Sequence, residues 1–144
     1  MRKTWRRPKC WPACRRPRIW PTIVWNVLPP FCLGPAFHEE FFPNVSVTYE
    51  RLELLAQRTA LDTMYSYAVV NRGEAPVVAQ VEISPDGVHY APDESISVQP
   101  HTTGVLVPKR YLRYTRLVLR TLQPAQMSLV DVYFQAQTRM QTDR

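Results

Sequence analysis

Residues 77–83 read Val77-Val78-Ala79-Gln80-Val81-Glu82-Ile83, and the turn sequence Ser84-Pro85-Asp86-Gly87 follows directly. Two long alternating runs, Tyr111–Leu122 and Met127–Gln137, close the same half of the chain. Apolar and polar residues that alternate at period two are typical of half-buried strands, because successive side chains point to opposite faces of a sheet. The stretch therefore predicts the larger part of an antiparallel β-sandwich.

The same alternation predicts which side chains form the core. In residues 77–83 the side chains at odd positions share one face, whereas Gln80 and Glu82 point outward. In the last run, the predicted inner row consists of Val130, Val132, Phe134 and Ala136. We expect both rows to be buried.

Further short strands are expected before and between these runs. The candidates are residues 45–49, 52–55, 63–71, 88–90, 96–98 and 104–107. Gly73, in the turn at 71–74, is free to adopt a positive φ, and we expect the turn at 85–87 to be type I with a glycine bulge. About seven or eight strands with no convincing helix predict an all-β fold, either an antiparallel β-sandwich or a jelly roll.

The basic charge of the chain is concentrated at its N-terminus. The 144 residues have a formal net charge of +6, but residues 1–18 contain eight basic residues and no acidic one. All four tryptophans, all three cysteines and eight of the 14 prolines precede Asn44. We therefore divide the chain into a basic arm rich in proline, tryptophan and cysteine at 1–40, a β-sandwich domain at 41–138 and a C-terminal tail at 139–144.

The prolines of the arm determine what it can form. Proline lacks an amide donor and has a fixed φ, so we expect an extended arm that is ordered only where another surface covers it. The apolar stretch at 19–33 is interrupted by Pro21, Asn26, Pro29 and Pro30. It therefore predicts neither a transmembrane segment nor a cleaved secretory signal.

The arm contains two sets of candidate functional residues. Large apolar side chains usually find a partner surface, so we expect four tryptophans to anchor the arm when it docks: Trp5, Trp11, Trp20 and Trp25. The cysteines Cys10, Cys14 and Cys32 are candidates for intermolecular disulfides, since an odd number leaves at least one without an internal partner. Reduced, packed thiols and metal binding remain alternatives, although the Cys10–Cys14 spacing fits neither a zinc ribbon nor a redox pair.

The sequence predicts no enzyme activity, no cofactor and no metal site. It has no nucleophile motif and no glycine-rich phosphate loop in a chain with four glycines. The run His38-Glu39-Glu40 has no further ligand at metal-binding spacing. Asp86 and Asp93 could contribute to a calcium site, but they are better explained as turn residues.

A second basic stretch precedes and enters the strand expected at 111–122. We expect it to form a basic surface with Arg110, Arg113, Arg116 and Arg120. Together with the arm, this surface could bind a polyanion or a nucleic acid. The simpler interpretation is a solvated outer face of the sheet, and we regard nucleic acid as the less favoured partner.

Four motifs in residues 41–138 resemble a family of small β-sandwich domains of unknown function from spore-forming bacteria. They are Ile83-Ser84-Pro85-Asp86-Gly87-Val88, Leu106-Val107-Pro108, Tyr111-Leu112-Arg113-Tyr114-Thr115-Arg116 and Tyr133-Phe134-Gln135-Ala136-Gln137. This resemblance implies no activity and no catalytic residue. In overall plan the region is also similar to discoidin-type carbohydrate-binding domains and to endospore-appendage subunits, in which the arm of one subunit is disulfide-linked to its neighbours.

Together these observations predict a non-enzymatic structural subunit that self-assembles into a filament or surface layer. We expect a homo-oligomer in which the arm of one copy docks on the β-sandwich of the next. The expected location is extracellular or on a spore or cell surface. The alternatives are a carbohydrate- or polyanion-binding module and nucleic-acid binding through the arm.

Overall fold

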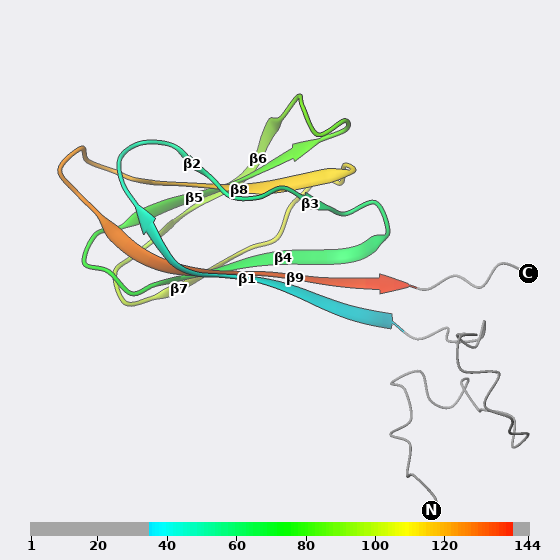
Figure 1. The fold of residues 1–144 in the computed structure, drawn as a ribbon, viewed down its shortest axis with the longest axis horizontal. Helices are drawn as coiled ribbons and strands as arrows, with labels where there is room; N and C mark the ends of the chain where they lie inside the picture. The colour runs from blue at the N-terminus through cyan, green and yellow to red at the C-terminus, as the bar shows by residue number, and fades with distance from the viewer. Residues whose placement is uncertain (1–34, 140–144) are drawn as a thin grey trace, which may run out of the picture.

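The computed structural model describes residues 35–139. This part of the chain forms an antiparallel β-sandwich without a helix (Figure 1), which confirms the predicted fold class. Its strands are β1 (Pro35–Val47), β2 (Leu52–Glu53), β3 (Gln57–Arg58), β4 (Asp62–Asn71), β5 (Val77–Ser84), β6 (Ala91–Val98), β7 (Thr103–Leu106), β8 (Tyr114–Thr121) and β9 (Ser128–Arg139).

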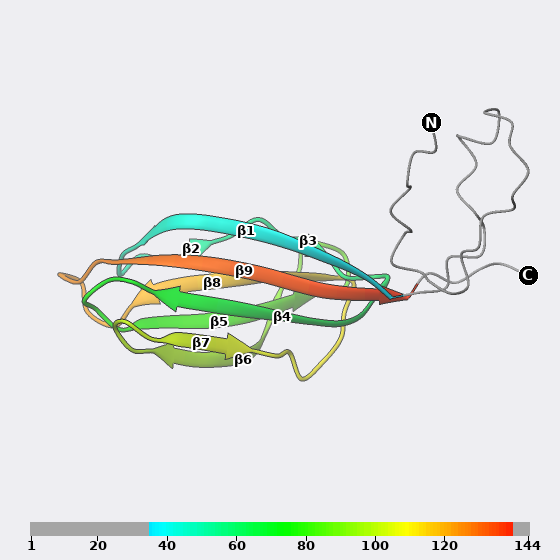
Figure 2. The ribbon, with the colours of Figure 1, turned by 90° about the horizontal axis from the view of Figure 1, so that it is seen from below.

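Two sheets stack to make the sandwich. Sheet A has the strand order β1-β9-β4-β7, and Figure 2 shows these four strands side by side. Sheet B has the order β2-β8-β5-β6, with β3 also paired to β8. Pro35 pairs with Arg139, so the described chain enters and leaves at the same end of sheet A.

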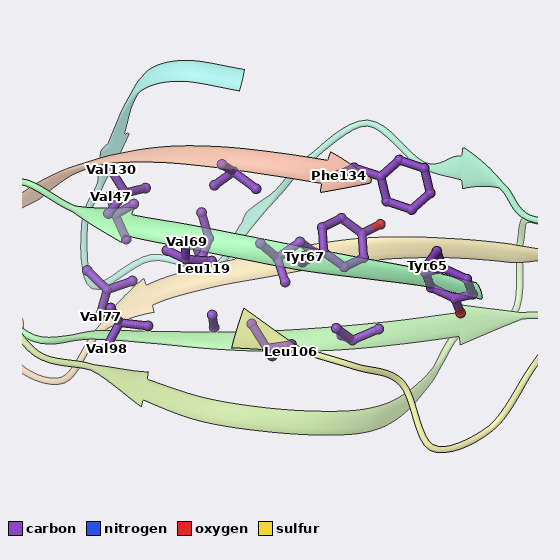
Figure 3. Close-up of a cluster of buried hydrophobic side chains, with 14 of the residues drawn as sticks. Val47, Tyr65, Tyr67, Val69, Val77, Val98, Leu106, Leu119, Val130 and Phe134 are labelled. Atoms are coloured by element: carbon purple, nitrogen blue, oxygen red, sulfur yellow. The ribbon is translucent and has the colours of Figure 1, made fainter. Parts of the chain in front are cut away.

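The core lies between the sheets and contains the two predicted rows. Val77, Ala79, Val81 and Ile83 of β5 are at most 2% exposed, and so are the four inner residues predicted on β9. At one end of the core the rings of Tyr65 and Tyr67 lie 5.8 and 5.1 Å from the ring of Phe134 (Figure 3). These contacts confirm that the alternation in the sequence marks the buried face of each strand.

The first strand differs from the expectation. It begins at Pro35 instead of residue 45, and it includes residues 35–40, which the sequence interpretation placed in the arm. Proline is tolerated because β1 is an edge strand, paired only with β9. The register shifts between Phe42 and Val45, where Asn44 has a φ of 53° and its amide donates to Asp131 Oδ1 at 2.8 Å.

One local expectation around the turns was wrong, and the positive φ lies at a different glycine. Residues 88–90 are not a strand, because Asp86 Oδ1 accepts hydrogen bonds from the amides of Val88 and His89 at 2.9 and 2.8 Å, and β6 begins after them. Gly73 does not adopt a positive φ, whereas Gly87 does, at 81°. Gly73 is needed for close approach instead, since a Cβ there would lie 2.0 Å from Ser128 Oγ.

Candidate functional site

The most organised polar group of the domain lies on the outer face of sheet B. We call it the Glu82 cluster, and it consists of Arg51, Glu53, Glu82, Tyr90 and Arg116. Both oxygens of Glu82 accept from Arg51 Nη2 at 2.7 Å, and Glu82 Oε2 accepts from Arg116 Nε at 2.8 Å. Glu53 pairs with the same two arginines at 2.9 and 2.8 Å. The guanidinium of Arg116 lies 3.7 Å from the centre of the Tyr90 ring.

Strand register explains why this cluster forms. Glu82 of β5 pairs directly with Arg116 of β8, and Glu53 of β2 pairs with Val118, two residues further along β8. Burial by itself would raise the pKa of Glu82, but the hydrogen bonds from Arg51 and Arg116 outweigh it and lower that pKa. Glu82 is therefore a charged carboxylate whose acceptors are used within the domain, which suits a structural role better than proton transfer.

A second carboxylate organises the loop before β8. Asp93 Oδ2 accepts from the amide of Lys109 at 2.6 Å, and its Oδ1 accepts from Arg110 Nε at 2.8 Å. Arg110 also donates to the carbonyl of Pro92 at 2.7 Å, and Lys109 pairs with Glu94 at 2.8 Å. Burial opposes ionisation of Asp93, but the bonds from Arg110 and Lys109 prevail and lower its pKa.

The remaining candidate ligands also bond locally. The Oγ of Ser84 accepts from the amide of Gly87 at 2.9 Å, while Asp86 lies 2.5 Å from Nδ1 of His89. Asp86 has a lowered pKa because of His89 and the amides it accepts from. Within residues 35–139, no three histidine, cysteine, aspartate or glutamate side chains are arranged to hold a metal ion. The same residues contain no helix long and apolar enough to cross a membrane.

The structure separates the four arginines of the predicted basic surface. Arg116 and Arg120 lie on the outer face of β8, whereas Arg110 and Arg113 precede that strand. Arg110 and Arg116 are each paired with carboxylates, and the Arg116 side chain is only 18% exposed. Arg113 lies 5.8 Å from the centre of the Tyr114 ring, and Arg120 is exposed.

The outer face of sheet A has a different chemistry. Four residues follow one another across all four strands in register, and we call them the apolar row: Phe41 of β1, Tyr133 of β9, Ala68 of β4 and Val105 of β7. The rings of Phe41 and Tyr133 stack at 4.4 Å, and Phe41 and Val105 remain 45% and 58% exposed. An exposed apolar row of this kind is a candidate contact surface.

The predicted anchors and thiols cannot be placed on this surface directly. The structure does not describe the residues that contain them: Trp5, Trp11, Trp20, Trp25, Cys10, Cys14 and Cys32.

Sequence reasoning missed both the Glu82 cluster and the apolar row. Arg51 and Glu53 gave a faint signal as an opposite-charge pair beside a short strand, but their partners depend on strand register.

A family model described as Domain of unknown function (DUF6385) matches residues 58–138. The match confirms the resemblance predicted from the motifs, although it begins later than residue 41. No curated protein matches the chain.

Two solved structures share the fold at low sequence identity. The first is from Bacillus endospore appendages, which form disulfide-linked pili; it is 12% identical with a TM-score of 0.53, and the match covers 74% of this chain and 89% of that one. The second is the PBSX exported protein XepA, 13% identical with a TM-score of 0.55, and the match covers 74% of this chain and 39% of that one. Both likenesses support the β-sandwich.

Proposed function

This chain belongs to the family described as Domain of unknown function (DUF6385), and we propose that it is a non-enzymatic structural subunit that assembles with copies of itself through its N-terminal arm. Intermolecular disulfides from Cys10, Cys14 and Cys32 would lock the contact. The proposal includes an extracellular location or one on a spore or cell surface.

One observation carries this proposal, which is the separation of residue types along the chain. Every tryptophan and cysteine precedes residue 33, and residues 35–144 contain neither type. The domain fills its own core, in which Phe134, Leu117 and Val132 are fully buried. The tryptophans of the arm are therefore not required by this core, and their large apolar surfaces favour docking on an outer surface.

The similar folds support the same interpretation. One belongs to appendages that form disulfide-linked pili, and the other belongs to an exported protein. Three cysteines in an arm ahead of a cysteine-free sandwich suit covalent links between subunits in an oxidising environment. Arm exchange between identical copies also produces open assemblies, because the donor and the receptor surfaces differ.

The charges of the domain make the alternative functions less favourable. Arg110 and Arg116 are paired with Asp93 and Glu82, so fewer cations of the domain are free to add to those of the arm in attracting a polyanion or a nucleic acid. Among the described residues, the charged clusters bond within the domain, and no feature favours carbohydrate binding over assembly.

The proposal can be tested by comparing the full-length protein with a variant that lacks residues 1–34. The deletion ends before β1, so every strand pair described for the domain is retained. We expect the full-length protein to form large species at tens of micromolar under oxidising conditions, seen by light scattering and electron microscopy. The deletion variant should be monomeric. A monomeric full-length protein would contradict the proposal.

A further inference from the structure

The two outer faces of the sandwich differ in their exposed apolar side chains. Within residues 35–139, every exposed large apolar residue that lies in a strand belongs to sheet A. These residues are Phe37, Phe41, Met64, Val105 and Leu129. The outer face of sheet B carries the Glu82 cluster instead. Sheet A is therefore the face that gains most from being covered.

Four of these five residues lie in two rows that are separated by a polar row, whereas Leu129 pairs with Ser46 outside both. Phe37 pairs with Gln137, which also pairs with Met64, and this second row lies four residues along β1 from the apolar row. The polar row between them contains Glu39, Gln135 and Ser66. The apolar row and the row of Phe37 and Met64 therefore lie about 13 Å apart, on either side of a row that contains a carboxylate.

Glu39 gives this surface a charge preference. Its Oε2 accepts a hydrogen bond from Gln135 Nε2 at 2.6 Å, and no cationic side chain among residues 35–139 forms an ion pair with it. The other carboxylate on this outer face, Asp131, is paired with Arg72 at 2.8 Å. Glu39 is thus an acceptor that favours a cation arriving together with apolar groups.

The arm has the complementary order of residues. Trp5 and Trp11 flank Arg6, Arg7 and Lys9, so two large apolar side chains stand on either side of positive charge. The 34 residues before β1 can span about 110 Å when extended, whereas the 13 residues of β1 span about 45 Å. This length allows an arm that starts at the end of sheet A to reach another copy.

We propose that the outer face of sheet A is the receptor for the arm of a neighbouring copy. The tryptophans of the arm contact the apolar row and the row of Phe37 and Met64, and an arginine between them pairs with Glu39. This inference rests on the proposed function and names the surface that the arm recognises.

The test uses full-length protein and two matched double variants. Phe41→Ser with Val105→Thr removes the exposed ends of the apolar row. Leu55→Ser with Val88→Thr removes two residues outside sheet A that are more exposed, at 74% and 75%. Because all four tryptophans belong to the arm, acrylamide quenching of tryptophan fluorescence reports on the arm alone, and light scattering reports on assembly.

We expect the sheet A variant to assemble only at a concentration about tenfold higher than wild type, with tryptophans that are more easily quenched. The control variant should resemble wild type. Glu39→Gln should weaken assembly by about threefold at low salt and have little effect at high salt. Circular dichroism checks each fold, and Val105→Thr alone replaces the double variant if Phe41→Ser unfolds the domain, because it leaves the ring stack intact.

The outcomes separate this inference from the proposed function. If wild type assembles and the sheet A variant assembles equally well, the arm docks elsewhere, and only the inference is overturned. An equal loss in both double variants would overturn it too, since the effect would not be specific to sheet A. A monomeric wild type would overturn both.

Discussion

Arg51 donates from Nη2 to both carboxylate oxygens of Glu82 at 2.7 Å, although the two residues are 31 positions apart in the sequence. The bond ties the segment before β2 to β5, and Arg116 of β8 adds a third bond to the same carboxylate at 2.8 Å. The Glu82 side chain is only 8% exposed. A single carboxylate therefore holds three separate segments of sheet B together.

Replacing this carboxylate should destabilise the domain. Glu82→Gln leaves Arg51 and Arg116 without their main partner, and we expect the free energy of unfolding to fall by about 2 kcal/mol. This loss is smaller than that expected for a fully buried ion pair, because Arg51 is half exposed. Urea unfolding of the full-length protein under reducing conditions measures this change. Glu74→Gln is the matched control at an exposed site and should alter stability by less than about 0.5 kcal/mol. Equal effects of the two substitutions would contradict a stabilising role for the Glu82 cluster.

The same carboxylates predict loss of stability in acid. The pKa values of Glu82 and Asp93 are lowered in the folded protein, so each stabilises the fold above its unfolded pKa of about 4. That contribution is lost as the pH falls through the lowered folded pKa. The melting temperature should therefore change little from pH 7 to about pH 5 and fall steeply below about pH 4.

A double variant shows whether these two groups are responsible. Glu82→Gln with Asp93→Asn should start less stable at neutral pH and lose less on acidification than wild type. A variant whose melting temperature falls with pH as steeply as that of wild type would assign the acid sensitivity to other carboxylates.

The core could be predicted from the sequence because alternation alone decides which side of a strand is buried. Val77–Ile83 and Val130–Ala136 show this, since their inner rows are right whatever strands lie beside them. The Glu82 cluster could not be predicted in the same way. It requires Glu82 to lie opposite Arg116, and strand register depends on tertiary pairing between segments distant in sequence.

The extent of β1 could not be predicted from the sequence for a related reason. Pro35 and Pro43 argue against a strand unless one edge of it is free, and only the sheet order shows that β1 is an edge strand. The apolar row could not be predicted either, because Phe41 and Val105 lie on the two opposite edge strands of sheet A. The arm remains a prediction from composition.

Gly73 should not tolerate a side chain. A Cβ at this position would lie 2.0 Å from Ser128 Oγ and 2.8 Å from the backbone nitrogen of Leu129. We expect Gly73→Ala to destabilise the domain by about 2 kcal/mol through overpacking, measured by urea unfolding. Removing the hydroxyl with Ser128→Ala should not rescue it, because the backbone atoms stay in place. Full rescue would show that the hydroxyl alone restricts this turn.

The domain should fold without its arm. Residues 35–144 contain the whole core cluster and no cysteine, so this fragment should give a β-sheet circular dichroism spectrum and a cooperative thermal transition that reductant does not change. A fragment that starts at residue 41 loses the first six pairs of β1 with β9. It should melt at a lower temperature, and equal melting temperatures would place the domain boundary at residue 41 instead of 35.

The cysteines should lock the assembly without being needed to form it. Cys10, Cys14 and Cys32 belong to the arm, whereas the proposed contact with the apolar row and Glu39 does not involve thiols. We therefore expect a triple Cys→Ser variant to assemble in native buffer like wild type. Because a disulfide contributes about 2–4 kcal/mol, its assemblies should dissociate at a urea concentration about 1–2 M lower than those of oxidised wild type.

Two controls identify the disulfide as the cause. Wild type treated with reductant should match the triple variant in urea, and the variant itself should not respond to reductant. On a non-reducing denaturing gel, oxidised wild type should give a ladder of covalent multimers, which any single Cys→Ser variant shortens if that cysteine links two chains. Oxidised wild type that runs only as a single chain would exclude intermolecular disulfides, because a covalent link between subunits must survive denaturation.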